Sequence, residues 1–166
     1  MRWMWIDRIV EHDPGERLVA VKNVSLAEEH MHDHLPGQPV MPAALLIEGM
    51  AQTSGIMVGA VNAFREKVIL AKILKAEIDQ DAIPGQTLRY TATMDRMDDA
   101  GATTNGVVHL RTNDSGDDSW HEVGRINLMF SHVDQNMSGL DFPEENFVFG
   151  ENFRAVWNAS GCVVEG

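Results

Sequence analysis

His34 and Glu48 are the two residues of this chain whose types and surroundings best suit acid–base chemistry. His34 precedes a Leu-Pro-Gly segment at 35–37 that cannot continue a regular helix. Glu48 is the only charged residue between positions 41 and 64, and a carboxylate in such apolar surroundings is costly unless it is paired or protonated. A protonated carboxyl is the form that a general acid needs near neutral pH, and a nearby imidazole can serve as the base. Such a pair would remove a proton next to a carbonyl group and expel a β-substituent.

Two further residues, Gln52 and Ala43, could complete such a site. Gln52 comes four residues after Glu48, on the same helix face, where its amide can hold the carboxyl group by a hydrogen bond. Ala43 follows Pro42 at the expected helix start, where unpaired backbone N–H groups and the positive end of the helix dipole can polarise a carbonyl oxygen. On spacing alone, an ion-paired or partly exposed glutamate and a surface histidine are the commoner outcomes.

A long helix and a set of strands must position these residues. Residues 41–64 form the longest stretch of low charge and predict a helix that is apolar nearly all round, and therefore buried, with Pro42 at its first position. Gly49, Gly55 and Gly59 lie inside it at a cost of about 1 kcal/mol each relative to alanine, which indicates close packing against the helix backbone. One buried helix and an antiparallel sheet wrapped around it make an α+β domain. Alternating apolar residues between turn signals predict the strands at 17–24, 68–78, 87–97, 103–112 and 119–132.

The pattern changes after about residue 134. We expect residues 1–133 to form the domain and residues 134–166 to be a C-terminal extension. That many aromatic side chains do not suit a free tail, so we expect the extension to dock on the domain or on a neighbouring subunit. The aromatic residues, which show no sustained period, are Phe142, Phe147, Phe149, Phe153 and Trp157.

The composition narrows the classes of function. The chain has 166 residues and a formal net charge of −12, and so acidic a surface disfavours nucleic acid and anionic membranes as partners. Residues 41–64 contain too many polar positions for a membrane-spanning helix. The single cysteine, Cys162, can form neither an intramolecular disulfide nor a thiolate zinc site. Since Asp7 and Arg8 interrupt the apolar start, we recognise no signal peptide and expect a cytoplasmic protein.

The stretch HLPGQPVMPAALLIEGMAQ at residues 34–52 closely resembles the signature of a known enzyme family. That signature, H-F-P-G-x-P-V-M-P-G-x-L-x-[I/L]-[E/D]-A-x-A-Q, belongs to the 3-hydroxyacyl-acyl-carrier-protein dehydratases, the FabZ/FabA-like family. Segments near residues 6–24 and 71–88 also look like that family, so the resemblance covers about residues 5–132. It implies a hotdog fold, in which an antiparallel sheet wraps one long central helix, and a dimer.

The resemblance also implies residue roles and a reaction. His34 would be the catalytic base and Glu48 the acid, contributed by different subunits across a dimer interface. The Ala43 N–H would bind the thioester carbonyl, and Gly37 and Gln52 would also contact the substrate. The reaction would convert (3R)-3-hydroxyacyl thioesters into trans-2-enoyl thioesters in fatty-acid or related lipid biosynthesis, with no cofactor and no metal.

The resemblance implies partners of two kinds. The acyl group would arrive on an acyl carrier protein or on coenzyme A, and the chain would form a homodimer or a trimer of dimers. Carrier proteins of this pathway are acidic, so they would dock on basic residues. A cluster of basic residues is more often simply a solvent-exposed surface. The only basic concentration consists of Arg65, Lys67, Lys72 and Lys75.

Three positions depart from the signature, and two other functions stay open. Ala43 replaces a glycine, Leu35 a phenylalanine and Gly49 an alanine, and none of these changes removes a catalytic group. The methyl group of Ala43 could nevertheless crowd the thioester. The alternatives are a hotdog acyl thioesterase and a non-catalytic acyl-binding module.

A run of alternating histidines raises the question of a metal site. On an extended segment, His30, His32 and His34 would face one side, which is ligand-like spacing. The family signature uses only the last of the three and no metal. We therefore expect His30 and His32 to be surface or pocket-rim residues.

Overall fold

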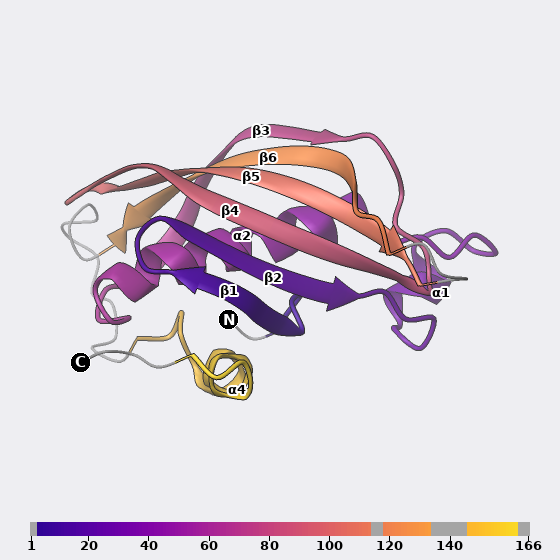
Figure 1. The fold of residues 1–166 in the computed structure, drawn as a ribbon, viewed down its shortest axis with the longest axis horizontal. Helices are drawn as coiled ribbons and strands as arrows, with labels where there is room; N and C mark the ends of the chain where they lie inside the picture. The colour runs from indigo at the N-terminus through magenta and orange to yellow at the C-terminus, as the bar shows by residue number, and fades with distance from the viewer. Residues whose placement is uncertain (1–2, 114–117, 134–145, 163–166) are drawn as a thin grey trace.

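The computed structural model describes residues 3–113, 118–133 and 146–162. In these ranges one antiparallel sheet curves around helix α2 (Ala43–Val61), as Figure 1 shows. The strand order is β1-β2-β4-β5-β6-β3. The strands are β1 (Arg8–Asp13), β2 (Arg17–Asn23), β3 (Val68–Ile78), β4 (Gln86–Asp98), β5 (Gly101–Thr112) and β6 (His121–His132). Two further helices lie within the described residues, α1 (His30–Asp33) and α4 (Glu151–Ala159).

Alternation of side chains gives the sheet one buried face. In β5 every second residue from Ala102 to Leu110 is buried, as a strand packed on one side requires. The predicted α+β class and all five predicted strands are confirmed, and β3 has the predicted bounds. Strand β1 was not predicted, because a register shift between Ile9 and Glu11 breaks its alternation.

Helix α2 is the core of the domain. Contrary to the expectation from its polar positions, its length and composition would suit a membrane span, but 67% of its most apolar stretch is buried inside the protein. The close packing predicted from its glycines is present: a Cβ on Gly49 would lie 2.5 Å from the ring of Tyr90, and one on Gly59 would lie 2.4 Å from the ring of Phe149. Pro42 is the N-cap residue, one position earlier than predicted.

Aromatic side chains cover the C-terminal end of α2. Phe64, just past the helix, has a φ of 58°, and its ring centroid lies 4.8–4.9 Å from those of Phe149, Phe153 and Trp157. These three residues are buried, and two of them lie four residues apart on α4, which also contacts β1. Helix α4 was not predicted, because nine residues give too few turns to establish a helical period.

Part of the predicted C-terminal extension, residues 134–145 with Phe142 and residues 163–166, lies outside the described ranges. The division of the chain at residue 134 therefore stays a prediction.

Candidate active site

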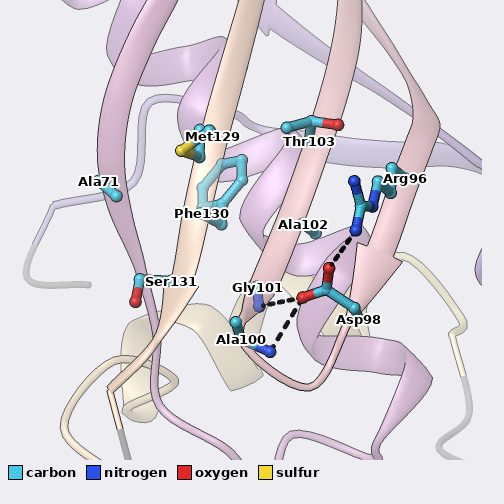
Figure 2. Close-up of a pocket in the computed structure, with 10 residues that line it drawn as sticks. All are labelled: Ala71, Arg96, Asp98, Ala100, Gly101, Ala102, Thr103, Met129, Phe130 and Ser131. Atoms are coloured by element: carbon cyan, nitrogen blue, oxygen red, sulfur yellow. Dashed lines mark hydrogen bonds and ion pairs between the residues drawn. The ribbon is translucent and has the colours of Figure 1, made fainter. Parts of the chain in front are cut away.

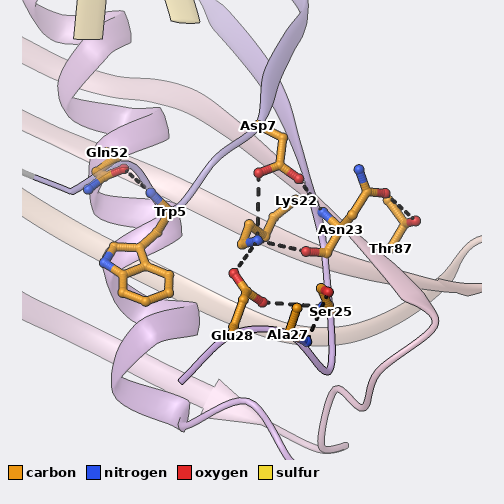
Figure 3. Close-up of polar contacts among 9 residues, drawn as sticks. All are labelled: Trp5, Asp7, Lys22, Asn23, Ser25, Ala27, Glu28, Gln52 and Thr87. Carbon is orange, nitrogen blue, oxygen red and sulfur yellow. Dashed lines mark hydrogen bonds and ion pairs between the residues drawn. The ribbon is translucent and has the colours of Figure 1, made fainter. Parts of the chain in front are cut away.

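Glu48 and Gln52 lie together on one face of α2. Gln52 is buried, and its Nε2 donates to Glu48 Oε1 over 2.9 Å, which confirms the hydrogen bond predicted from their spacing. The N-terminal segment holds the same amide, since Nε2 also donates to the Trp3 carbonyl at 2.7 Å. Oε1 accepts the Trp5 N–H at 2.7 Å, the contact that Figure 3 draws. Because Oε1 faces a backbone donor, the amide presents its NH₂ group to Glu48. Glu48 Oε2 accepts no hydrogen bond from the described residues and is the oxygen available to a ligand.

A groove of about 270 Å³ extends beside Glu48 along α2. Glu48, Ala51, Gln52 and Gly55 form its helix wall, since residues three and four apart share a helix face. The remaining lining residues are Val68, Ile69, Leu70, Phe130, Phe147 and Val148. All of these are apolar, so the half-buried carboxyl group of Glu48 lies at the edge of an apolar groove.

His34 is exposed at the C-terminal end of α1. Its backbone N–H donates to the His30 carbonyl over 3.1 Å. His34 does not line the groove beside Glu48, and among the described residues no hydrogen bond or ion pair joins the two side chains. Within one chain, the described structure thus shows no direct contact between the His34 and Glu48 side chains.

A buried lysine anchors the segment that carries His34. Lys22 is 5% exposed, and its Nζ donates to Glu28 Oε1 and to the Asn23 carbonyl, each at 2.7 Å. Asp7 Oδ1 lies 3.6 Å from the same nitrogen (Figure 3). Glu28 precedes Glu29, the N-cap residue of α1, and Met31 within α1 is buried in the core. The polar network and this apolar contact fix α1 on the domain. The sequence signal for Lys22 is a charged residue at an inward-facing position of an alternating strand.

Gly37 lies on the connection between α1 and α2, Ala43 begins α2, and both residues are exposed. Gly37 has a φ of 79°, a left-handed conformation that favours glycine, and an added Cβ would meet no atom within 4 Å. Its place is therefore set by backbone conformation and not by close packing. Ala43 is the first residue of α2, where the helix leaves its N–H group without an intrahelical acceptor. This N–H and the Glu48 carboxyl thus belong to the first two turns of one helix.

The three histidines do not lie on an extended segment, and His32 is exposed while His30 is half-buried. Residues 30–33 are helical, so His30 and His34 share a face and His32 does not. His32 Nε2 lies 2.9 Å from the Leu26 carbonyl oxygen. Burial beside the Trp5 ring lowers the pKa of His30. In the described part of the chain, no three His, Cys, Asp or Glu side chains are placed to hold a metal ion.

A second hollow, of about 390 Å³, lies over the turn between β4 and β5 (Figure 2). Its charged residues are Arg96 and Asp98, which form an ion pair. The Asp98 carboxylate accepts the backbone N–H groups of Ala100 and Gly101 at 3.0 and 3.3 Å, and these hydrogen bonds, the first above all, lower its pKa. Both charged groups thus serve the turn, and neither His34 nor Glu48 lines this hollow.

A family model and several curated proteins are similar in sequence to this chain. The family model described as a FabA-like domain matches residues 2–118. The 3-hydroxyacyl-[acyl-carrier-protein] dehydratase FabZ of Geobacter metallireducens is 41% identical over 90 residues, which are 52% of this chain and 60% of the relative. The FabZ of Clostridium tetani is 35% identical over 106 residues, 63% of this chain and 75% of the relative. A third relative is the bifunctional enzyme LpxC/FabZ of Chlorobaculum tepidum, which is 41% identical over 97 residues. These residues are 57% of this chain and 21% of the relative.

Solved structures match the fold. An acyl-CoA hydrolase from Agrobacterium tumefaciens superposes with a TM-score of 0.59 at 15% identity and covers 74% of this chain and 45% of its own. The E. coli PaaI protein from the phenylacetic acid degradation operon gives 0.56 at 12% identity, over 75% and 78%. The dehydratase heterocomplex ApeI:P from Xenorhabdus doucetiae gives 0.55 at 11% identity, over 73% and 92%. At such identities the matches establish the fold alone, and they confirm the hotdog arrangement.

Proposed function

This chain belongs to the FabA-like family, and from that premise we propose that it removes water from (3R)-3-hydroxyacyl thioesters to give trans-2-enoyl thioesters. One observation carries the proposal: a half-buried carboxyl group, Glu48, faces an apolar groove with one oxygen fixed by Gln52 and the other available to a ligand. The FabZ relatives carry the same activity in their names.

In the proposed reaction, His34, the Ala43 N–H and Glu48 each have a separate role. His34 takes a proton from Cα of the thioester, and the Ala43 N–H stabilises the negative charge that develops on the thioester oxygen. Glu48 protonates the hydroxyl group on Cβ as the carbon–oxygen bond breaks. The products are the enoyl thioester and water, and the protonated imidazole and the carboxylate then exchange protons with solvent. Gly37 supports the approach of the thioester through its backbone, and Gln52 orients Glu48.

A homodimer would bring His34 of one subunit to Glu48 of the other. Strand β3 supports such an assembly, because it is an edge strand of eleven residues. Ile73 pairs with Leu128, which is fully buried, so both side chains lie on the inner face of the sheet; Ile73 is nevertheless 45% exposed. Leu70, opposite buried Phe130, is 38% exposed in the same way. Apolar side chains on the inner face that stay exposed are suited to a second copy.

The acyl group would be carried by an acyl carrier protein or coenzyme A, and the enzyme would act in the cytoplasm in fatty-acid or related lipid biosynthesis. Of the four basic residues expected to bind an acidic carrier, only two are exposed without a described ion-pair partner. Lys67 is buried, and Lys75 forms an ion pair with Glu77, whereas Arg65 and Lys72 are exposed. Arg65 and Lys72 are therefore the residues of this group that we assign to carrier docking.

Hydration of trans-2-butenoyl-CoA and trans-2-octenoyl-CoA, followed by loss of the enoyl absorbance, tests the activity in reverse. We expect Glu48→Gln and His34→Asn to lower kcat by about 10³, within the range of acid–base contributions. Glu29→Gln and His32→Asn, which alter exposed residues of the same types, serve as controls and should hydrate the substrates like the wild type. Release of free coenzyme A without loss of enoyl absorbance would identify a thioesterase instead, and binding without either signal would identify a non-catalytic module.

Mixing the two inactive variants tests the shared site. After subunit exchange at equal concentrations, about half of the dimers are mixed, and each has one intact and one doubly altered site, so about a quarter of the wild-type activity should return. If each site took both groups from one chain, every site would remain damaged and no activity would return.

A further inference from the structure

The groove beside Glu48 has a defined direction. Glu48 lies near its helix start, and Gly55 follows seven residues later on the same face, so the helix wall is about 10 Å long. Beyond the two polar residues at 48 and 52, the lining is apolar. A carbon chain that entered beside Glu48 would therefore find apolar contacts along the whole wall.

Residues from the C-terminal part of the chain line this groove together with the proposed acid. Phe147 and Val148 are both among the lining residues. The Asn146 side chain fixes the segment: its Nδ2 donates to the carbonyl groups of Phe64 and Glu66 at 2.8 and 3.0 Å. Its Oδ1 accepts the Val148 N–H at 3.0 Å. Asn146 thus fixes the backbone on both sides of Phe147.

Phe149, two residues after Phe147, packs closely against α2 and Phe64. The Phe149 ring occupies the space that a Cβ on Gly59 would need, and it packs against Phe64 at an interplanar angle of 58°, with ring centroids 4.9 Å apart. Phe149 is 2% exposed. Phe147, in contrast, is 49% exposed, so its ring is a part of the groove wall that can change in size without opening the core.

We propose that Phe147 determines the length of the acyl chain that the groove accepts, with residues 146–149 forming its end wall. This inference rests on the proposed function, since it takes the occupant to be the acyl chain of the thioester that reacts at Glu48. A carbon–carbon bond of about 1.5 Å advances an extended chain by slightly less than its length, so a 10 Å wall accommodates about eight carbons. Chains beyond that length must displace or bypass the Phe147 ring.

Phe147→Ala and Phe147→Trp test the proposal on a series of butenoyl-, octenoyl- and dodecenoyl-CoA. For Phe147→Ala, kcat/KM with dodecenoyl-CoA should rise by about fourfold for each additional methylene that becomes buried, while kcat/KM with butenoyl-CoA stays unchanged. Phe147→Trp should lower kcat/KM for octenoyl-CoA. Ile83→Ala, which shortens an equally exposed apolar residue away from the groove, is the matched control and should leave the profile unchanged.

Binding of saturated octanoyl- and dodecanoyl-CoA, measured by calorimetry, separates this inference from the proposed function. A protein without hydratase activity in which Phe147→Ala still tightens dodecanoyl-CoA binding would keep the inference and refute the reaction. An active enzyme whose chain-length profile is the same in all Phe147 variants would refute the inference and keep the reaction. If no acyl-CoA bound to any variant, both would be overturned, and the groove would be better assigned to contact with the second subunit.

Discussion

Replacing Gly49 by alanine perturbs the helix beside the proposed acid. A Cβ at this position would lie 2.5 Å from Cζ and 2.6 Å from the hydroxyl oxygen of Tyr90, much closer than real Cβ contacts. Tyr90 is fully buried, so its ring cannot turn away into solvent. Because the family signature has alanine here, the glycine indicates that Tyr90 and residue 49 have been matched to each other in this chain.

Two opposing effects set the magnitude. Alanine is favoured over glycine inside a helix by about 1 kcal/mol. Forcing a methyl group into a packed core costs about 1–3 kcal/mol, and an overlap of this size belongs at the upper end. We therefore expect Gly49→Ala to lower the free energy of unfolding by about 2 kcal/mol and Tm by about 4–8 °C. Since Glu48 is adjacent, displacement of the helix should also lower kcat by about tenfold or more.

Thermal unfolding at one fixed protein concentration, followed by circular dichroism, measures the effect. Gly55→Ala is the matched control, because its Cβ would lie an acceptable 3.4 Å from the Phe130 ring and the helix preference should dominate. In a Gly49→Ala/Tyr90→Leu double variant the overlap disappears, so the alanine should no longer destabilise the protein. A Gly49→Ala protein that melts at or above the wild-type temperature would refute the reasoning.

Three further predictions concern groups outside the groove. Lys22→Met should lower the free energy of unfolding by about 2 kcal/mol in urea titrations, because Glu28 loses a charged hydrogen-bond donor; an unchanged midpoint would contradict this. Burial lowers the pKa of His12 from 6.5, so between the two values the unfolded chain binds more protons and stability should fall as the pH drops below 6.5. His12→Gln should reduce that slope in urea midpoints taken at pH 5.5 and 7.5, and an equal slope would show that His12 does not contribute. Burial raises the pKa of the Cys162 thiol, so iodoacetamide at pH 8 should react faster in urea than with the folded protein, and equal rates would count against it.

The long elements could be predicted from the sequence because their patterns are local. Helix α2 is apolar nearly all round, and β3 to β6 each have eleven or more residues between clear turns. The missed elements are short. Strand β1 has six residues and a register shift, α1 has four residues, and the helical spacing of Phe153, Val156 and Trp157 in α4 spans a little more than one turn. A period needs several repeats before it stands out from chance.

The site was predictable where it depends on one helix and unpredictable where distant segments meet. The Gln52–Glu48 hydrogen bond follows from an i, i+4 spacing and was predicted. The Trp3 and Trp5 backbone groups that also bind Gln52 lie 49 and 47 residues earlier in the chain. Likewise, nothing in the local sequence of Phe147 indicates that it lines the same groove as Glu48. Such contacts are set by the tertiary fold.

Two polar residues break the local pattern of their elements, and their hydrogen bonds distinguish structure from function. Lys22 lies on the buried face of β2, and its ammonium group has Glu28, Asn23 and Asp7 as partners. A buried charge whose N–H donors all face partners within the chain stabilises one arrangement of the chain. It has no donor left for a ligand. Glu48 interrupts the apolar helix α2 with only one of its oxygens bonded within the described residues, and the groove lies beside it. Because Glu48 is half-buried and lines the groove, its unbonded oxygen is open to a molecule in the groove, and we propose that this molecule is the substrate.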